Sequence, residues 1–504
     1  MQVHTLLHQP LRDAARHDPQ KCALICGGRR MSYRELADEA GNLSTDLRER
    51  GLQRGDRVLI LLPNCPAAAV SIYATLEAGG VFSVINASVK PGKLDPILAN
   101  CEPAFVITDA AGLRKLSAIP ERLPSRGVYV TGDAPCDTIS FDQACRTQRT
   151  ATRVGLIDVD LAAIIYTSGT TSVPKGVTLS HRNMVSASRS IAAYLELSGA
   201  DTILSPLPLS FDYGLYQLLL SVSAGATLCL QEGFGFPFEL LRSISSFGVT
   251  VLPCVPTMMA VMLRLQEQSG LDLSSVRAIT NTGAALPGAW IPRLQGMFPA
   301  AQLFSMYGLT ECKRVSWLPP DELATRPDSV GHPIDCCEVF VADEHGHFHD
   351  RDATGELVVR GANVMCGYWR DPEASAKVLR DGPHPWEKVL FTGDLFRIDA
   401  DGYLYFLGRM DQVFKSRGER VSPREIEVVL YAIQGVGAVR VTPVPDPLLG
   451  NAIRAEVVCE GRELTVAEVK RHCRERLEDR LVPGLIEIVD RLPISDAGKV
   501  KSDG

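Results

Sequence analysis

A hydroxyl- and glycine-rich run, Tyr166-Thr-Ser-Gly-Thr-Thr-Ser-Val-Pro-Lys-Gly-Val177, constrains this chain more than any other segment. The apolar residues 161–165 before it are typical of a buried strand, and Ser180 after it is a candidate N-cap for a helix. A strand, a flexible loop and a helix in this order offer backbone N–H groups to phosphate oxygens, and Lys175 adds a positive charge. The spacing differs from the G-x-x-x-x-G-K-S/T pattern. Taken alone, the run is also compatible with a surface loop rich in turn-forming residues.

Apolar runs alternate with helical patterns over most of the chain. Residues 57–62, 80–84 and 105–108 have the composition of buried strands, and residues 67–76 have that of a helix between the first two. Strands separated by helices of this length favour parallel α/β layers. We therefore expect an α/β protein whose large N-terminal part is built of layered α/β subdomains.

The character of the sequence changes in its last third. Residues 330–406 combine short strands, such as 356–360, with many Gly and Asp turns, which predicts a β-rich subdomain. A helix over residues 423–432 and a strand–helix–strand tail then predict a small α+β domain. The expected division is a large domain over residues 1–407, a hinge at 408–411 and a small mobile domain over 412–504.

Composition excludes several classes of protein. The formal net charge is −7, so no basic surface for nucleic acid is expected. No apolar run approaches the roughly 18 residues that a membrane span needs, and the first residues lack the layout of a signal peptide. The 14 cysteines form no C-x-x-C pairs, which favours reduced thiols in a cytoplasmic protein over a zinc site or a disulfide framework.

Six further motifs follow the loop in a fixed order: Asn281-Thr-Gly-Ala-Ala285, Met306-Tyr-Gly-Leu-Thr-Glu311, Thr392-Gly-Asp394, Gly408-Arg409, Lys415-x-x-Gly418 and Gly498-Lys499. Together they resemble the adenylate-forming (AMP-binding) superfamily of acyl-CoA synthetases, peptide-synthetase adenylation domains and luciferases, over nearly the whole chain. The resemblance implies an ATP- and Mg²⁺-dependent acid–thiol ligase. Such an enzyme forms an acyl-AMP, releases pyrophosphate, and passes the acyl group to the phosphopantetheine thiol of CoA or of a carrier protein acting in trans.

The resemblance also assigns residues to the phosphates. The loop residues would hold the β- and γ-phosphates: Thr167, Ser168, Gly169, Thr170, Thr171 and Lys175. Glu311 would hold Mg²⁺, a role that suits a hard oxygen ligand, and Thr310 would contact the α-phosphate. Without its neighbours Glu311 would be read as a solvated loop carboxylate.

The AMP moiety has its own set of residues by the same resemblance. Tyr307 would stack on adenine, and Gly283, Ala284 and Ala285 would flank the base. Asp394 would accept the ribose hydroxyls, and Arg409 would support the same sugar. Outside this context an Asp after Gly is usually a turn residue.

The resemblance places the adenylation lysine at Lys499, whereas Lys501 does not follow a glycine. Asp411 occupies the hinge about which the small domain would rotate between the two half-reactions. After rotation Lys415, Gly418 and Arg420 would line the route of the thiol. Without the resemblance, a lysine near a terminus such as Lys499 would be read as a solvated surface residue. Arg420 could likewise be an ordinary surface arginine.

The identity of the acid stays open at the level of the sequence. The predicted acid pocket contains Phe211, Asp212, Thr282 and Arg314. Phe211-Asp212 follows the amino-acid pattern, in which the aspartate pairs with the substrate ammonium; a buried carboxylate needs such a partner. The alternative is that Lys313 or Arg314 pairs with Asp212. Charges at those two positions suit a second carboxylate or a polar acid better than an apolar amino acid.

Three functions follow from these observations. The main prediction is a ligase for an amino acid or polar acid, and the first alternative is a fatty or aryl acyl-CoA synthetase. The second is a non-catalytic AMP- or acyl-binding relic, which is conceivable because Ser172 replaces a glycine usual in the loop. A luciferase-like oxygenase would need a special aromatic substrate.

Overall fold

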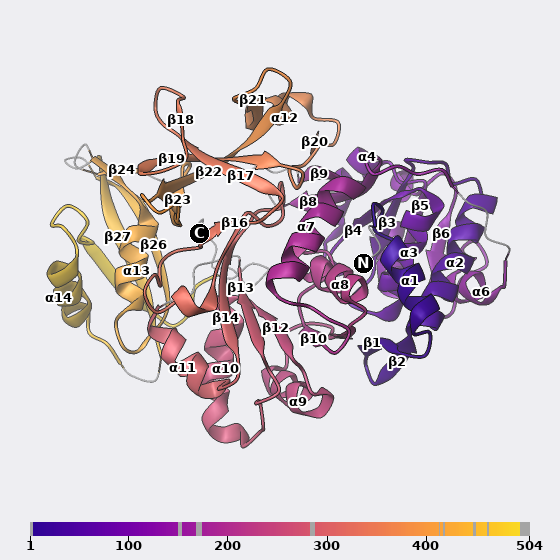
Figure 1. Cartoon of the computed structure of the whole chain (residues 1–504), viewed down its shortest axis with the longest axis horizontal. Helices are drawn as coiled ribbons and strands as arrows, with labels where there is room; N and C mark the ends of the chain where they lie inside the picture. The colour runs from indigo at the N-terminus through magenta and orange to yellow at the C-terminus, as the bar shows by residue number, and fades with distance from the viewer. Residues whose placement is uncertain are drawn as a thin grey trace.

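The computed structural model describes residues 4–149, 154–167, 174–282, 288–412, 414–416, 419–446, 450–460 and 463–493. Three sheets and the helices that cover them account for the chain up to Arg409, and a smaller α+β unit follows (Figure 1). The predicted fold class is therefore confirmed.

The first sheet has the strand order β20-β9-β8-β4-β3-β5-β6-β7, and its members from β8 to β7 run parallel. Its strands are β3 (Arg57–Leu61), β4 (Val81–Val84), β5 (Phe105–Thr108), β6 (Val128–Val130), β7 (Ile139–Ser140), β8 (Leu161–Thr167), β9 (Lys175–Ser180) and β20 (Gly367–Tyr368). Its helices are α2 (Tyr33–Glu49), α3 (Pro66–Ala78), α4 (Pro91–Cys101), α5 (Ala110–Ser117) and α6 (Phe141–Arg146). The strands and the helix predicted over residues 57–108 are all present.

The layout predicted around the phosphate-binding loop is wrong by one strand. Between the loop and the helix the chain forms β9, which pairs antiparallel with β8, so that Thr167 and Lys175 lie opposite each other. This segment contains the β-branched residues Val177 and Thr178, which suit a strand. Ser180 is the N-cap of α7 (His181–Tyr194), as expected, and its hydroxyl accepts a hydrogen bond of 3.2 Å from the Asn183 N–H.

The second sheet has the order β16-β15-β14-β13-β12-β10-β11-β1-β2, with parallel strands from β14 to β1. Its strands are β1 (Cys22–Cys26), β2 (Arg29–Ser32), β10 (Thr202–Ser205), β11 (Thr227–Leu230), β12 (Val251–Cys254), β13 (Ala278–Asn281), β14 (Gln302–Tyr307), β15 (Ser316–Leu318) and β16 (His332–Pro333). The remaining helices of this part are α1 (Gln9–His17), α8 (Asp212–Ala224), α9 (Pro237–Phe247), α10 (Pro256–Ser269) and α11 (Ile291–Met297).

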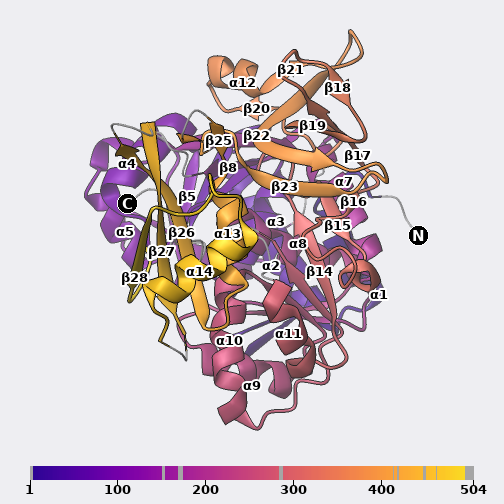
Figure 2. The same cartoon turned by 90° about the vertical axis from the view of Figure 1, so that its left-hand side faces the viewer.

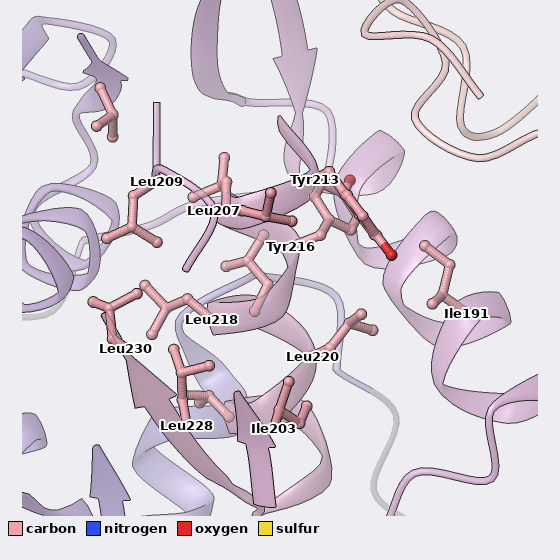
Figure 3. Close-up of a cluster of buried hydrophobic side chains, with 14 of the residues drawn as sticks. Ile191, Ile203, Leu207, Leu209, Tyr213, Tyr216, Leu218, Leu220, Leu228 and Leu230 are labelled. Carbon is pink, nitrogen blue, oxygen red and sulfur yellow. The ribbon is translucent and has the colours of Figure 1, made fainter. Parts of the chain in front are cut away.

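Helix α8 is buried along nearly its whole length between these layers. Figure 3 shows Leu218 and Leu220 of α8 beside Ile203 of β10 and Leu228 and Leu230 of β11. Burying a leucine side chain contributes about 1.5–3 kcal/mol, so this cluster fixes the helix firmly. The start of α8 is consequently held in place at the edge of the candidate site. No helix in the described residues has the length and apolar composition that a membrane span requires.

The predicted β-rich subdomain forms an antiparallel sheet with the order β18-β17-β19-β22-β21, and β23 pairs with β22 (Figure 1). Its elements are β17 (Cys337–Ala342), β18 (Phe348–His349), β19 (Ala353–Gly361), α12 (Pro372–Val378), β21 (Leu379–Asp381), β22 (Lys388–Ile398) and β23 (Leu404–Arg409). Asn363, which follows β19, connects this sheet to the second sheet. Its side-chain amide donates to the carbonyls of Cys312 and Arg314, between β14 and β15, at 2.9 and 2.8 Å.

The C-terminal unit has an apolar core of its own, which includes Val421, Ile426 and Val457. Its elements are β24 (Phe414–Ser416), β25 (Glu419–Val421), α13 (Pro423–Tyr431), β26 (Val436–Asp446), β27 (Gly450–Cys459), α14 (Val466–Arg476) and β28 (Leu485–Val489). In Figure 2 the two helices lie in front of the sheet β26-β27-β28. Among the contacts with the rest of the chain, the rings of Trp290 and Tyr431 meet edge to face at 6.3 Å.

Replacing the buried Asn363 with alanine is expected to destabilise the large domain by about 2–4 kcal/mol, because two buried carbonyls would lose their donor. The unfolding free energy from chemical denaturation measures this change. Asn86→Ala is the control, since its side chain accepts a hydrogen bond in an exposed turn, and we expect a change within about 1 kcal/mol. Equal losses in the two variants would contradict the role given to Asn363.

Candidate active site

The turn between β14 and β15 carries several of the predicted site residues and is tightly folded. The Val315 N–H donates to the Tyr307 carbonyl at 2.9 Å, and the Lys313 N–H donates to the Leu309 carbonyl at 2.6 Å. Gly308 is required, because a Cβ there would lie 2.0 Å from the Lys313 carbonyl oxygen. Lys313 itself has φ +65°, which is unusual for a residue with a side chain. The turn thus holds residues 310–314 in a defined, partly strained conformation.

On one side of this turn lies a cluster of Tyr307, Asp394 and Arg409. Asp394 on β22 and Arg409 on β23 are partners in the strand register, and Arg409 Nη1 lies 2.9 Å from Asp394 Oδ1. The Tyr307 hydroxyl donates to Asp394 Oδ2. Burial raises the pKa of Asp394, and the Arg409 charge opposes that rise. The cluster is a buried carboxylate with oriented donors around it.

The local sequence Thr392-Gly-Asp394 explains how this carboxylate is aimed. Gly393 has φ +71°, a conformation that favours glycine, and its N–H donates to Glu356 Oε1 at 2.9 Å. The Asp394 N–H donates to Thr392 Oγ1 at 3.1 Å. The ring of Tyr307 meets that of Phe396 at 4.7 Å in a T-shaped contact, which fixes the tyrosine next to the aspartate.

Glu311 and Lys175 lie at the base of the phosphate-binding loop, and Tyr368 joins them. The Tyr368 hydroxyl donates to Glu311 Oε1 at 2.9 Å, while Lys175 Nζ lies 5.1 Å from the centre of the Tyr368 ring. Sequence reasoning missed Tyr368. It reaches the site only because β20 pairs with β9, a pairing that no local pattern around residue 368 indicates.

Glu311 suits Mg²⁺ only as a partner of substrate phosphates. The described residues contain no group of three or more His, Cys, Asp or Glu side chains that could hold a metal ion. Mg²⁺ is typically bound through one or two carboxylates together with substrate phosphates and water. Glu311 provides one such carboxylate, and the hydrogen bond from Tyr368 leaves its second oxygen available. The residues present therefore fit the metal that the sequence implies.

On the other side of the turn is a cavity of about 70 Å³ between α7, α8 and the end of β13. It brings together all four residues of the predicted acid pocket and adds four from the turn, Gly308, Leu309, Thr310 and Lys313. Its polar lining includes Asp212, Thr282, Thr310, Lys313 and Arg314, and Phe211 contributes an aromatic wall.

Asp212 has a cationic partner within the protein. Its Oδ2 lies 3.7 Å from Lys313 Nζ, and it also sits in the first turn of α8, where the helix dipole favours a carboxylate. Burial lowers the pKa of Lys313 to about 8, and the Asp212 charge opposes this effect. Lys313 Nζ lies 4.5 Å from the centre of the Tyr216 ring. Of the two cations weighed for Asp212, Lys313 is therefore the closer partner.

Arg314 is the second buried cation of the cavity and has 5% of its surface exposed. Its Cζ lies 5.7 Å from the centre of the Tyr213 ring, and the Tyr213 hydroxyl is fixed by a 3.0 Å hydrogen bond to the Thr280 carbonyl. Figure 3 shows Tyr213 and Tyr216 near the side of α8 where Ile191 of α7 lies. The rings of the two tyrosines thus line the cavity and contact the two cations.

Several predicted site residues cannot be placed. Residues 168–171 of the phosphate loop, Gly283, Ala284, Ala285, Gly418 and Lys499 lie outside the described residues. Lys415 and Arg420 are partners in the strand register of β24 and β25, where the structure describes their backbone. Asp411 follows β23, and its Oδ1 lies 3.5 Å from Arg409 Nε. The predicted hinge residue therefore contacts the arginine of the Asp394 cluster.

Known proteins of similar sequence include a CoA ligase, a CoA synthase and a tyrocidine synthase. A long-chain-fatty-acid–CoA ligase of Bacillus subtilis is 30% identical over 98% of this chain and 93% of its own length. A feruloyl-CoA synthase of Amycolatopsis is 32% identical over 96% of this chain and 95% of its own. Tyrocidine synthase 2 of Brevibacillus parabrevis is 28% identical over 99% of this chain, which matches 14% of that much longer protein.

A solved structure and two family models agree with these relatives. The ATP-bound MatB of Rhodopseudomonas palustris superimposes with a TM-score of 0.88 at 30% identity, covering 99% of this chain and 97% of its own. Residues 11–369 match the model of the AMP-binding enzyme, and residues 425–499 match that of its C-terminal domain. The chain therefore belongs to the AMP-binding, adenylate-forming enzyme family and is an ATP-dependent, AMP-forming acid–thiol ligase.

Proposed function

We propose that the enzyme adenylates a small polar carboxylic acid and then transfers it to a phosphopantetheine thiol. One observation carries the proposal: the turn after β14 joins the Asp394 cluster to a polar cavity. Thr310 lines that cavity, and Glu311 is the next residue in the chain. An acid bound in the cavity would thereby meet the α-phosphate of a nucleotide bound at Asp394. Little covalent work falls to the protein, so holding the two reactants together provides most of the acceleration.

The adenylation step joins the acid to the α-phosphorus. An oxygen of the substrate carboxylate attacks the α-phosphorus, and the bond from that phosphorus to the pyrophosphate oxygen breaks. Thr310 would donate to the α-phosphate, and Lys499 would bridge the carboxylate and the same phosphate. Both donors offset negative charge that develops along the reaction.

The nucleotide would be held by the clusters around the turn. Asp394 would accept the ribose hydroxyls beside Arg409, and Tyr307 would stack on adenine next to residues 283–285. Thr167, Lys175 and residues 168–171 would cradle the β- and γ-phosphates. Mg²⁺ bound by Glu311 would neutralise phosphate charge and so ease the departure of pyrophosphate.

Thioester formation would follow a rotation of the small domain about residues 408–411, which separates a domain over 1–407 from one over 412–504. The ion pair between Arg409 and Asp411 supports this position, because it couples the expected hinge to the sugar-binding cluster. Lys415, Gly418 and Arg420 would then line the route of the thiol. The likeness to a tyrocidine synthase supports a carrier protein, and the CoA ligases support CoA. The free cysteines are consistent with a cytoplasmic location.

The polar cavity favours an amino acid or another polar acid over an apolar chain, because an apolar occupant would leave the buried guanidinium of Arg314 without a carboxylate partner. The named relatives support the alternative of a fatty or aryl acid. Acid-dependent ATP–pyrophosphate exchange over a panel of amino, dicarboxylic, fatty and aryl acids separates them. We expect the strongest exchange with a short polar acid. Preference for fatty or aryl acids would establish the alternative. Absence of exchange with every acid, together with intact ATP binding, would indicate a non-catalytic AMP- or acyl-binding protein.

Lys499→Ala is expected to lower the rate of adenylation by at least about 100-fold, since a donor to the developing charge is lost. Thioester formation from supplied acyl-adenylate should be unaffected, which a single-turnover assay measures. Lys501→Ala is the matched control and should retain both steps. Equal loss of the two steps in Lys499→Ala would contradict the proposed role.

Tyr368→Phe removes the hydroxyl that orients Glu311 and keeps the ring beside Lys175. We expect exchange activity to fall roughly tenfold, the effect of losing one hydrogen bond to a charged group. Calorimetry should also show weaker Mg²⁺-dependent binding of ATP. Tyr405→Phe removes a similar bond to Asp399, outside the site, and should leave both unchanged. Identical behaviour of the two variants would refute the orienting role of Tyr368.

A further inference from the structure

The cavity beside Thr310 contains more hydrogen-bond donors than acceptors. Lys313 Nζ and the Nε and Nη1 atoms of Arg314 are buried, and none of them has a hydrogen-bond partner in the described part of the chain. Buried polar atoms without partners are uncommon in folded proteins, and each calls for an explanation. All three belong to residues that line the same cavity, which is the position that a bound ligand would occupy.

The charges of the cavity do not balance either. Asp212 lies 3.7 Å from Lys313 and compensates one of the two cations. The guanidinium of Arg314 has no carboxylate within ion-pair distance among the described residues. The tyrosine rings contribute attraction, but a cation–π contact offsets only part of the cost of burying an unpaired ion. One positive charge therefore remains uncompensated among the described residues that line the cavity.

The protein holds this unbalanced arrangement firmly in place. Asn363 binds the carbonyls on both sides of Lys313, and Gly308 allows the close approach that the turn requires. Backbone strain of the kind seen at Lys313 tends to persist at ligand-binding positions. The two cations are thus presented to the cavity by a rigid support.

We infer that this cavity recognises the second carboxylate of a short dicarboxylic acid, and that Arg314 is the residue that determines this specificity. The inference rests on the proposed function, in which the first carboxylate is the one adenylated. A carboxylate forms a fork with Nη2 of a guanidinium and either its Nε or its Nη1, and both of these last two donors are unpartnered in Arg314. The negative charge of this carboxylate also compensates the positive charge of Arg314.

Other substrate classes fit less well. The ammonium of an amino acid would add a positive charge to a cavity that already has one in excess, and Asp212 already faces Lys313. A long acyl chain is too large, because about 70 Å³ at roughly 10–15 Å³ per water-sized group holds on the order of five such groups. Apart from the carboxylate that reacts, a dicarboxylic acid of three to six carbons has roughly four to seven heavy atoms, so it satisfies both charge and size.

The test compares kcat/KM in acid-dependent pyrophosphate exchange for pairs of acids with equal length: malonate and propionate, succinate and butyrate, glutarate and pentanoate, adipate and hexanoate. 4-Aminobutyrate is the cationic counterpart. In the wild-type enzyme we expect the best diacid to exceed its monoacid partner by roughly 30- to 1,000-fold, the range for a buried charged contact.

Arg314→Met should abolish this preference by lowering kcat/KM for the diacid by a similar factor while sparing or improving the monoacid. Arg314→Lys should restore part of the preference, since it keeps the charge and loses the fork. Arg189→Met replaces an exposed arginine of α7 and should behave as wild type. The diacid should raise the melting temperature of the wild type and not of Arg314→Met, a readout independent of turnover. That variant should fold, because apolar replacements of buried charges are often neutral or stabilising.

The possible results distinguish a failure of the inference from a failure of the proposed function. Exchange that is stronger with monoacids or 4-aminobutyrate overturns the inference and leaves the ligase activity standing. A diacid preference that survives in Arg314→Met overturns the role of Arg314. Absence of exchange with every acid, in an enzyme that still binds ATP, overturns the proposed function and the inference together.

Discussion

The tight turn between β14 and β15 is the constraint on which the rest of the site depends. Tyr307 enters it beside Asp394, Glu311 lies at its tip, and Arg314 leaves it inside the polar cavity. A Cβ at position 308 would collide with the backbone of Lys313, so the turn can close only around a glycine. Because one rigid segment serves the three proposed binding regions, its shape fixes their relative positions.

Two separate sheets hold this turn. Strands β14 and β15 of the second sheet form its base, and Asn363, which follows β19 of the third sheet, binds its carbonyls from the other side. The same third sheet supplies Asp394 and Arg409. The packing of the β-rich subdomain against the α/β layers is thus what assembles the site, and a residue such as Asn363 affects it without meeting any substrate.

Much of the architecture follows from local pattern. The strands at residues 57–61 and 105–108 and the capped start of α7 were predictable, because apolar runs and Ser180 carry their signals within a few residues. Strand β9 was missed since it lies between the loop and the N-cap Ser180, where the sequence suggested that the loop leads directly into the helix. Residues at 212 and 314 were assigned to one pocket through family motifs. The choice of Lys313 as the partner of Asp212, by contrast, depends on the left-handed backbone at Lys313, which no sequence pattern reveals.

Tyr368 marks the limit of such reasoning most clearly. Its hydroxyl reaches Glu311 through the pairing of β20 with β9, between segments almost two hundred positions apart. Unbalanced charge is likewise visible only in three dimensions. Lys313 and Arg314 read as ordinary consecutive cations in the sequence, and the structure alone places both in a buried cavity with a single carboxylate.

The central claim is that the acid cavity and the nucleotide cluster place a carboxylate oxygen next to the α-phosphorus. The most direct test uses an acid labelled with ¹⁸O in its carboxylates, followed by mass analysis of the products after turnover with ATP and a thiol. The account predicts AMP that carries one ¹⁸O atom and pyrophosphate that carries none. Label in orthophosphate or pyrophosphate, or unlabelled AMP, would contradict it, because the acid oxygen would then have attacked elsewhere or not at all.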